Sequence, residues 1–272
     1  LSTSDWERIR VEAKFGGKGL GSRVMRCCER LTFALAKVSI ATNQTFREVA
    51  LTRGGMHPEN VFIVQSGPSL DQIGDVVPDK QYRKPQWQHV LGYVGVMGNQ
   101  DGVDVLLQAT RHLVIDQGYT GLGLVLVGYG PEEENLRQLS TDLGLDDHVV
   151  FTGRLNGKEM FAALADVDIG VCPDPKNDFN DHLTMNKVME YMMLSKPVVM
   201  FDLVEGRRTA QDAALYAQDN DPQSFATEVS RLIKDDSLRK KLGQTGRQRI
   251  EQTLSWEYEQ AKLLAAYEKA LS

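Results

Sequence analysis

The sequence predicts an α/β protein built on a doubly wound parallel sheet. Three features indicate this fold class: short apolar runs of strand length recur, segments with helical periodicity separate them, and small or polar residues follow the apolar runs. Strands that are buried on both faces read as continuous apolar runs, and parallel strands need a helical crossover between them. Ligands of such sheets bind at the carboxyl ends of the strands.

The first predicted elements lie before residue 66. Apolar residues at helical spacing, with arginines between them, predict an amphipathic helix over 22–37. A strand over 38–41 follows, then a helix over 46–51 that Thr42 and Asn43 would cap, and then a strand over 61–64. The glycine-rich stretch 16–21 lacks the Gly-Lys-Ser/Thr of a phosphate loop and follows no strand, so we expect a flexible connector.

Residues 66–88 hold three prolines and show no sustained periodicity, which predicts a linker with a domain boundary near residue 85. Beyond it, strands and helices alternate regularly. The predicted strands are 90–94, 122–127, 149–152, 167–172, 197–201 and 213–217. The predicted helices are 102–116, 132–143, 157–165, 184–194 and 205–211, followed by charged helices to the end.

Composition narrows the class of protein. The 272 residues are 42% hydrophobic and 25% charged, as in ordinary globular proteins, and the net charge of −6 offers no global positive field for nucleic acid. Three cysteines cannot form a disulfide framework, so a reducing, cytoplasmic compartment is expected. The first residue is Leu1 rather than Met, so we expect a piece of a longer protein.

Four loops follow predicted strand ends and favour a ligand edge. They contain Gly95, then Gly128 and Gly130, then Gly153 with Arg154 and Leu155, and finally the polar run 173–182. Glycine lets the backbone approach a ligand closely, and the helix N-termini that follow attract anions. Each loop alone is consistent with an ordinary turn. The four together favour a phosphorylated ligand.

The segment 184–199 carries the sharpest candidate pair. Lys187 falls in the first turn of a predicted helix, where the dipole disfavours a cation unless an anion is near. Glu190 follows at i+3, so both side chains share one helix face and could bind a phosphate and a ribose diol. The spacing fits a surface ion pair equally well.

A metal site is not expected. Asp174, Asp178, Asp181 and His182 crowd one predicted loop, but their spacing matches no known ligand pattern. We therefore predict neither a bound metal nor a cofactor.

The order and spacing of several motifs resemble those of the family 4 glycosyltransferases (glycosyl transferases group 1) of the GT-B fold. The resemblance rests on residues 92–95, 102–107, 126–131, 149–154, 184–199, 201–203, 212–216 and 255–256. It implies a Rossmann-like donor domain and a truncated second Rossmann-like acceptor domain. Residues 1–85 would be the tail of the acceptor domain and the linker, 86–253 the nucleotide-sugar donor domain, and 254–272 a C-terminal helix returning to the acceptor domain.

The resemblance also implies site roles. Glu190 would bind the ribose hydroxyls, Lys187 would face the diphosphate, and Gly153 to Leu155 would lie against the base. Gly95, Gly128, Gly130 and Asp181 would complete the donor site. The family usually has Arg and Lys where this chain has Val96 and Asp101, and Arg207 could replace the lost charge. His182 and Ser195 also depart from the pattern. The catalytic groups would lie in the missing half.

The expected function is therefore transfer of a hexosyl group from a nucleoside diphosphate sugar to a saccharide or lipid-linked acceptor, in polysaccharide or glycolipid synthesis. The resemblance implies a retaining, metal-independent enzyme of the cytoplasm. It leaves open whether the protein contacts the inner face of a membrane and whether this piece is active alone. Val96 and Asp101 motivate an alternative, a non-catalytic nucleotide-sugar-binding module. A dehydrogenase is disfavoured, because no Gly-x-Gly-x-x-Gly joins the first strand of either half to its helix.

Overall fold

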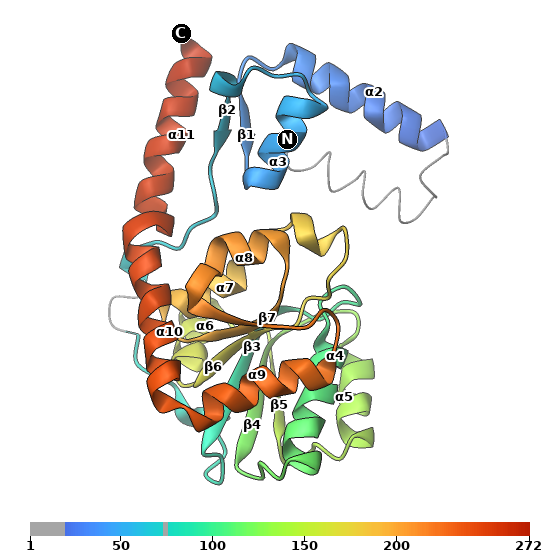
Figure 1. The fold of residues 1–272 in the computed structure, drawn as a ribbon, viewed down its shortest axis with the longest axis vertical. Coiled ribbons are helices and arrows are strands. Elements are labelled where there is room, and N and C mark those ends of the chain that lie inside the picture. Colours follow the sequence, from blue (N-terminus) through green and yellow to red (C-terminus); the bar gives the residue numbers. More distant parts are fainter. Residues whose placement is uncertain (1–19, 73–75) are drawn as a thin grey trace.

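The computed structural model describes residues 20–72 and 76–272 and contains a small and a large parallel sheet (Figure 1). The small sheet pairs β1 (Ser39–Ala41) with β2 (Val61–Ile63). The large sheet has six strands in the order β5-β4-β3-β6-β7-β8, and every neighbouring pair is parallel. Its strands are β3 (His89–Val96), β4 (Leu122–Tyr129), β5 (Val149–Gly153), β6 (Ile169–Cys172), β7 (Val198–Phe201) and β8 (Ala214–Ala217). The predicted fold class is confirmed.

The strand order places a topological switch between β3 and β6. From β3 the chain winds first toward β5, and then crosses back to β6 and continues toward β8. The two strands pair only at Leu91 with Ile169 and at Gly92 with Gly170. Beyond those residues β3 and β6 separate, which opens a crevice at their carboxyl ends.

Helices connect the strands as the periodicity predicts. The connecting helices are α4 (Val103–Arg111), α5 (Glu133–Asp142), α6 (Gly157–Ala165), α7 (Asn186–Met193) and α8 (Val204–Ala210). The last strand is followed by α9 (Pro222–Lys234), α10 (Asp236–Arg249) and α11 (Trp256–Leu271). The helix predicted over 102–116 is α4 continued by a π-helical turn, His112–Asp116. A second π-helical turn, Ile250–Leu254, joins α10 to α11. No helix in the described residues is both long and apolar enough to span a membrane.

Two apolar layers cover the large sheet. Leu91 and Tyr93 of β3 point into a layer shared with α4, α5 and α9, whereas Val90 and Val94 point into a layer shared with α6 and α7. This alternation follows from the two-residue period of a strand. Both layers consist of buried apolar side chains, so the sheet is buried on both faces, as the continuous apolar runs predicted.

The N-terminal elements form a smaller unit around β1 and β2. They are α2 (Leu20–Leu35), which was predicted over 22–37, and α3 (Gln44–Thr52), and their core includes Phe33, Ala50 and Val61. Asn43 caps α3 by accepting a hydrogen bond from the Phe46 amide at 2.9 Å, which confirms the predicted cap. Most of the predicted glycine-rich connector, residues 16–19, lies outside the described residues.

The predicted linker packs on the large sheet along much of its length. Trp87 is 4% exposed, and its indole Nε1 donates to the Asp147 carbonyl at 3.1 Å. Gly123 makes room for this ring, since a Cβ there would lie 2.1 Å from it. Val76 and Tyr82 pack on the same apolar layer. The segment before β3 is therefore part of the large unit's surface.

The last helix, α11, returns along the small unit (Figure 1). Glu259 on α11 is fully buried and accepts a hydrogen bond from the Gln65 amide, just after β2, at 2.8 Å. A buried carboxylate is tolerated only with such partners. This contact fixes the end of the chain beside the small sheet.

We predict that the two apolar layers carry the stability of the large unit. Leu232→Ala on α9, where the side chain is fully buried, should lower the free energy of unfolding by about 2–5 kcal/mol. Leu264→Ala on α11, where the side chain is 55% exposed, should change it by less than about 0.5 kcal/mol. Urea unfolding of both variants measures the difference, and equal losses would contradict the assigned core.

Candidate functional site

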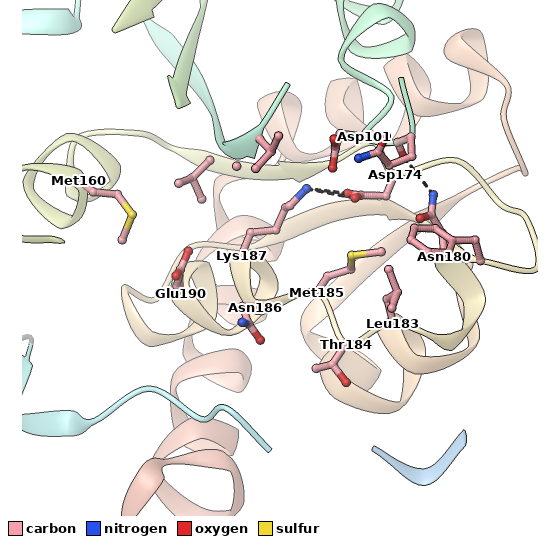
Figure 2. A pocket seen from close by; sticks show the side chains of 15 residues that line it. Asp101, Met160, Asp174, Asn180, Leu183, Thr184, Met185, Asn186, Lys187 and Glu190 are labelled. Atoms are coloured by element: carbon pink, nitrogen blue, oxygen red, sulfur yellow. Dashed lines mark hydrogen bonds and ion pairs between the residues drawn. The ribbon is translucent and has the colours of Figure 1, made fainter. Parts of the chain in front are cut away.

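A cavity of about 280 Å³ lies at the switch point, where β3 and β6 end (Figure 2). Residues 94–96 of β3 form one wall, and Asp174, just after β6, contributes a second. The segment 183–187, which leads into α7, forms a third wall together with Glu190. The cavity therefore lies where doubly wound sheets bind their ligands.

Tyr191 of α7 fills the gap between the separating strands. Its hydroxyl accepts from the Val94 amide at 3.0 Å and donates to the Val171 carbonyl at 3.2 Å. Gly170 makes space for the ring, because a Cβ there would lie 2.4 Å from it. Tyr191 thus satisfies backbone groups that would otherwise pair in the sheet, and it anchors α7 beneath the cavity.

Lys187 forms a buried ion pair with Asp174. Its Nζ donates to the two carboxylate oxygens at 3.1 and 2.8 Å, and the side chains are 10% and 4% exposed. Figure 2 shows Lys187 reaching from α7 toward Asp174. Burial by itself lowers the pKa of Lys187, but the carboxylate of Asp174 outweighs it and raises this pKa well above the ordinary value. The anion that the position of Lys187 required is therefore supplied within the chain.

Glu190 lines the cavity one turn further along α7, on the same face as Lys187. Burial raises the pKa of Glu190, and the nearby ammonium of Lys187 only partly offsets this effect. In the described part of the chain, the ion pair of Lys187 is the one with Asp174 rather than one with Glu190. Among the described residues, the carboxylate of Glu190 therefore lies in the cavity without an ion-pair partner.

Asp101 is a further acidic group on the cavity wall. Its Oδ2 accepts from the Gly98 amide at 2.9 Å, and burial raises its pKa against the opposing effect of Lys187. Among the described lining residues there are therefore three carboxylates, Asp101, Asp174 and Glu190, and one ammonium, that of Lys187. The cavity carries no excess of positive charge.

Asn180 joins the loops after β3 and β6. It is 1% exposed, and its Nδ2 donates to the carbonyls of Gln100 at 3.1 Å and Pro175 at 2.8 Å. The sequence analysis singled out neither Asn180 nor the pairing of Asp174 with Lys187. The sequence did contain a signal for them, because Asp174 and Asn180 lie in the polar loop that follows an apolar strand.

The predicted glycines have different roles. Gly95 lines the cavity and has a φ of 154°. Gly128 and Gly130 let the loop after β4 pack closely against the end of β3. A Cβ at Gly128 would lie 1.9 Å from the Gly95 carbonyl oxygen, and a Cβ at Gly130 would lie 2.3 Å from the Met97 carbonyl oxygen. These two glycines allow close packing of the loops rather than lining the cavity.

The group predicted to face a base lies at the end of β5. Gly153 has a φ of 72°, Arg154 is exposed with its guanidinium 5.6 Å from the Tyr129 ring, and Leu155 packs against the core. All three lie at the carboxyl ends of the strands, as the cavity does, but none of them lines the cavity.

Arg207 and Asp181 also lie outside the cavity lining. Arg207 pairs with Asp202 at 2.5 and 2.8 Å, and its guanidinium stacks 3.7 Å from the ring centre of Tyr216. Asp181 accepts from the Val204 amide at the start of α8 at 3.0 Å and pairs with Lys176. The structure thus brings together Gly95, Lys187 and Glu190, and engages Arg207 and Asp181 elsewhere. Their roles in binding stay predictions.

The acidic loop does not assemble into a metal cluster. Across residues 20–72 and 76–272, no three His, Cys, Asp or Glu side chains come together in a way that could hold a metal ion. Ser195, which departs from the expected motif, adopts a left-handed φ of 56°. Glycine would adopt that conformation without strain.

Comparison with known proteins identifies the family. A model of the glycosyl transferases group 1 matches residues 88–235. The chain belongs to this family. Together with structures of this class, the six-stranded sheet confirms the predicted GT-B fold.

Two relatives and one structure illustrate the match. A capsular polysaccharide biosynthesis glycosyltransferase of Staphylococcus aureus is 22% identical over 88% of this chain and 63% of its own length. A GDP-mannose-dependent phosphatidylinositol monomannoside mannosyltransferase of Mycobacterium tuberculosis is 30% identical over 60% of this chain and 43% of its own. The HepE protein of Anabaena, solved with UDP and glucose, has a TM-score of 0.72 and 17% identity, over 89% of this chain and 66% of its own.

The chain spans about half to two thirds of the length of the curated relatives it matches. The structural neighbours share its fold at low identity, so they establish the architecture of the chain. What each of them binds is a property of that protein.

We predict that the hydroxyl of Tyr191 stabilises the switch point. Tyr191→Phe should lower the free energy of unfolding by about 1–3 kcal/mol, because it leaves a buried amide and a buried carbonyl without their partner. Tyr267→Phe, on α11 where the ring is 57% exposed, is the matched control and should have little effect. Denaturant unfolding of both variants tests this, and similar values for the two would refute it.

Proposed function

We propose that this chain is the donor-binding part of a glycosyltransferase that moves a hexosyl group from a nucleoside diphosphate sugar to an acceptor hydroxyl. The observation that carries the proposal is the placement of Lys187 and Glu190 on the face of α7 that lines the switch-point cavity. Family membership supports it. The relatives named for capsular polysaccharide and for a phosphatidylinositol mannoside support an acceptor in polysaccharide or glycolipid synthesis.

The chemistry of the cavity suits such a donor. A carboxylate such as that of Glu190 can accept hydrogen bonds from both ribose hydroxyls. Lys187 and the first amides of α7 would meet the diphosphate, since helix N-termini favour anions. Gly153, Arg154 and Leu155, at the end of β5, would lie against the base. In this arrangement the diphosphate competes with Asp174 for the ammonium of Lys187.

The finer proposal is a retaining, metal-independent transfer without a cofactor. Charge developing on the leaving diphosphate would be stabilised by Lys187 and backbone N–H groups, which act without reorganisation because they are already in place. Retention rests on the family resemblance. In the same scheme residues 86–253 form the donor domain, 1–85 the end of the acceptor domain with the linker, and 254–272 the returning helix. The place of action would be the cytoplasm, and peripheral contact with the inner face of a membrane stays open.

A second function has a specific observation in its favour. Val96 and Asp101 stand where the family usually has cations, and the lining has three carboxylates to one ammonium. Such a cavity fits a nucleotide-sugar-binding module that performs no transfer. Incubation of the complete protein with UDP-sugars and GDP-sugars distinguishes the two, because only the enzyme releases UDP or GDP. The configuration of the product, read by NMR, tests retention.

Nucleotide binding should depend on Glu190 and persist in the presence of a chelator. Glu190→Gln should weaken UDP or GDP binding by about tenfold or more, since bonds to a charged acceptor contribute about 1.5–3 kcal/mol each. The difference in nucleotide affinity between wild type and variant should narrow as the pH falls. The raised pKa of Glu190 means that its carboxylate is protonated at a higher pH than an ordinary carboxylate. Calorimetric titration of the protein with UDP or GDP, in the presence of EDTA and at several pH values, measures both effects.

Glu134→Gln on α5, an exposed site, is the matched control for this titration. Equal affinities of wild type and Glu190→Gln would show that the carboxylate of Glu190 takes no part in nucleotide binding. A tenfold loss on adding EDTA to the wild type would instead establish that a metal is required.

Lys187, more than Arg207, should carry diphosphate recognition. Replacing Lys187 alone would strand the buried Asp174, so Lys187→Gln is combined with Asp174→Asn. This double variant should lose most of the advantage of UDP over uridine, whereas Asp174→Asn alone should keep that advantage because the ammonium remains. Arg207→Gln should also keep it, since Arg207 is engaged with Asp202 outside the lining. The opposite pattern, with the advantage lost only in Arg207→Gln, would assign the diphosphate to Arg207.

A further inference from the structure

One side chain of the small unit reaches the wall of the cavity in the large one. Asn43 lies between β1 and α3 and is 1% exposed. Its Nδ2 donates to the His182 carbonyl at 2.8 Å and to the Thr184 hydroxyl at 3.2 Å. The partners are 139 and 141 residues away in the sequence, so this contact joins the two units directly.

The contact falls at the beginning of α7. His182 and Thr184 flank Leu183, and the chain then enters the helix that carries Lys187 and Glu190. Within the described residues, the N-cap residue of α7, Met185, makes no side-chain capping bond, so α7 begins without a cap of its own. The start of α7 is therefore braced from outside by Asn43.

The two ends of the Asn43 amide have separate tasks. Its Oδ1 accepts from the Phe46 amide and caps α3, while Nδ2 makes both bonds to the segment that leads into α7. A nearby contact strengthens the same junction, because the Thr45 amide donates to the buried carboxylate of Glu205 on α8 at 2.9 Å. The cap and the brace can therefore be separated by substitution.

We propose that Asn43 is a positioning residue of the donor site, which holds residues 182–184 so that Lys187 and Glu190 are presented to the ligand. This inference rests on the proposed function. Asn43 does not line the cavity, so it acts through the segment that does. Without the brace, that segment gains conformational freedom, which binding must then remove at the expense of affinity.

Two variants keep the cap and remove the brace. Serine and aspartate both cap helices about as well as asparagine. Asn43→Ser is neutral but too short to span to His182, and Asn43→Asp keeps the size but turns an acceptor toward the His182 carbonyl. Agreement between the two excludes an effect of the added charge. The same substitutions at Asn156, which caps α6 through the Glu159 amide on an exposed surface, are the matched controls.

The experiment measures amide hydrogen exchange of residues 183–187, UDP and GDP affinity, and the thermal midpoint of each variant. Both Asn43 variants should exchange faster in this segment and bind the nucleotide about five- to tenfold more weakly, with thermal midpoints close to those of the Asn156 variants. The Asn156 variants should match the wild type in exchange and affinity.

Three results would overturn the proposal. Unchanged exchange in residues 183–187 would show that Asn43 does not brace them. Faster exchange with wild-type affinity would make the contact structural only. Affinity lost in step with a collapsed thermal midpoint would mean general destabilisation. If the wild type itself binds neither UDP nor GDP, the proposed function fails first, and that result is distinct from the other three.

Discussion

The ion pair between Lys187 and Asp174 joins α7, the helix that carries the candidate binding residues, to the loop that follows β6. Both groups are almost completely buried. Removing one partner of such a pair costs about 3–5 kcal/mol, because the other charge stays buried without compensation. The pair also offsets the unfavourable position of a lysine in the first turn of α7. The geometry of the cavity therefore depends on these two residues as a unit, and a bound anion must share Lys187 with Asp174.

A second constraint lies below this pair, where the strands separate. A parallel sheet that splits leaves amides and carbonyls without a partner, and Tyr191 supplies both a donor and an acceptor there. Because Tyr191 and Lys187 belong to the same helix, α7 is fixed at two points along its length. A crevice that is open enough for a ligand is thus compatible with a buried apolar core beneath it.

The fold was largely predictable from the sequence, because hydrophobic periodicity and the composition of strand-end loops depend on residues that are close along the chain. The position of Lys187 and Glu190 on one helix face was predictable for the same reason. The remaining features depend on distant partners. The family resemblance suggested that Arg207 replaces the charge lost at Val96 and Asp101. In the structure Asp202 and Tyr216 engage Arg207, because the chain between β7 and β8 brings the three residues together. Asp174 looked like one of several loop acids until the fold placed α7 beside it. The brace by Asn43 crosses 139 residues and leaves no local pattern.

The double use of the Asn43 amide has a consequence for exchanging halves between relatives. If the large unit of this chain were grafted onto the small unit of a relative, it would receive whatever residue caps the equivalent of α3 there. If that residue were serine, threonine or aspartate, the graft would keep the capped helix and the sheet, but the segment that leads into α7 would lose its hydrogen bonds to Asn43. A chimera of this family therefore needs its junction chosen so that the turn at residues 42–45 travels with the large sheet.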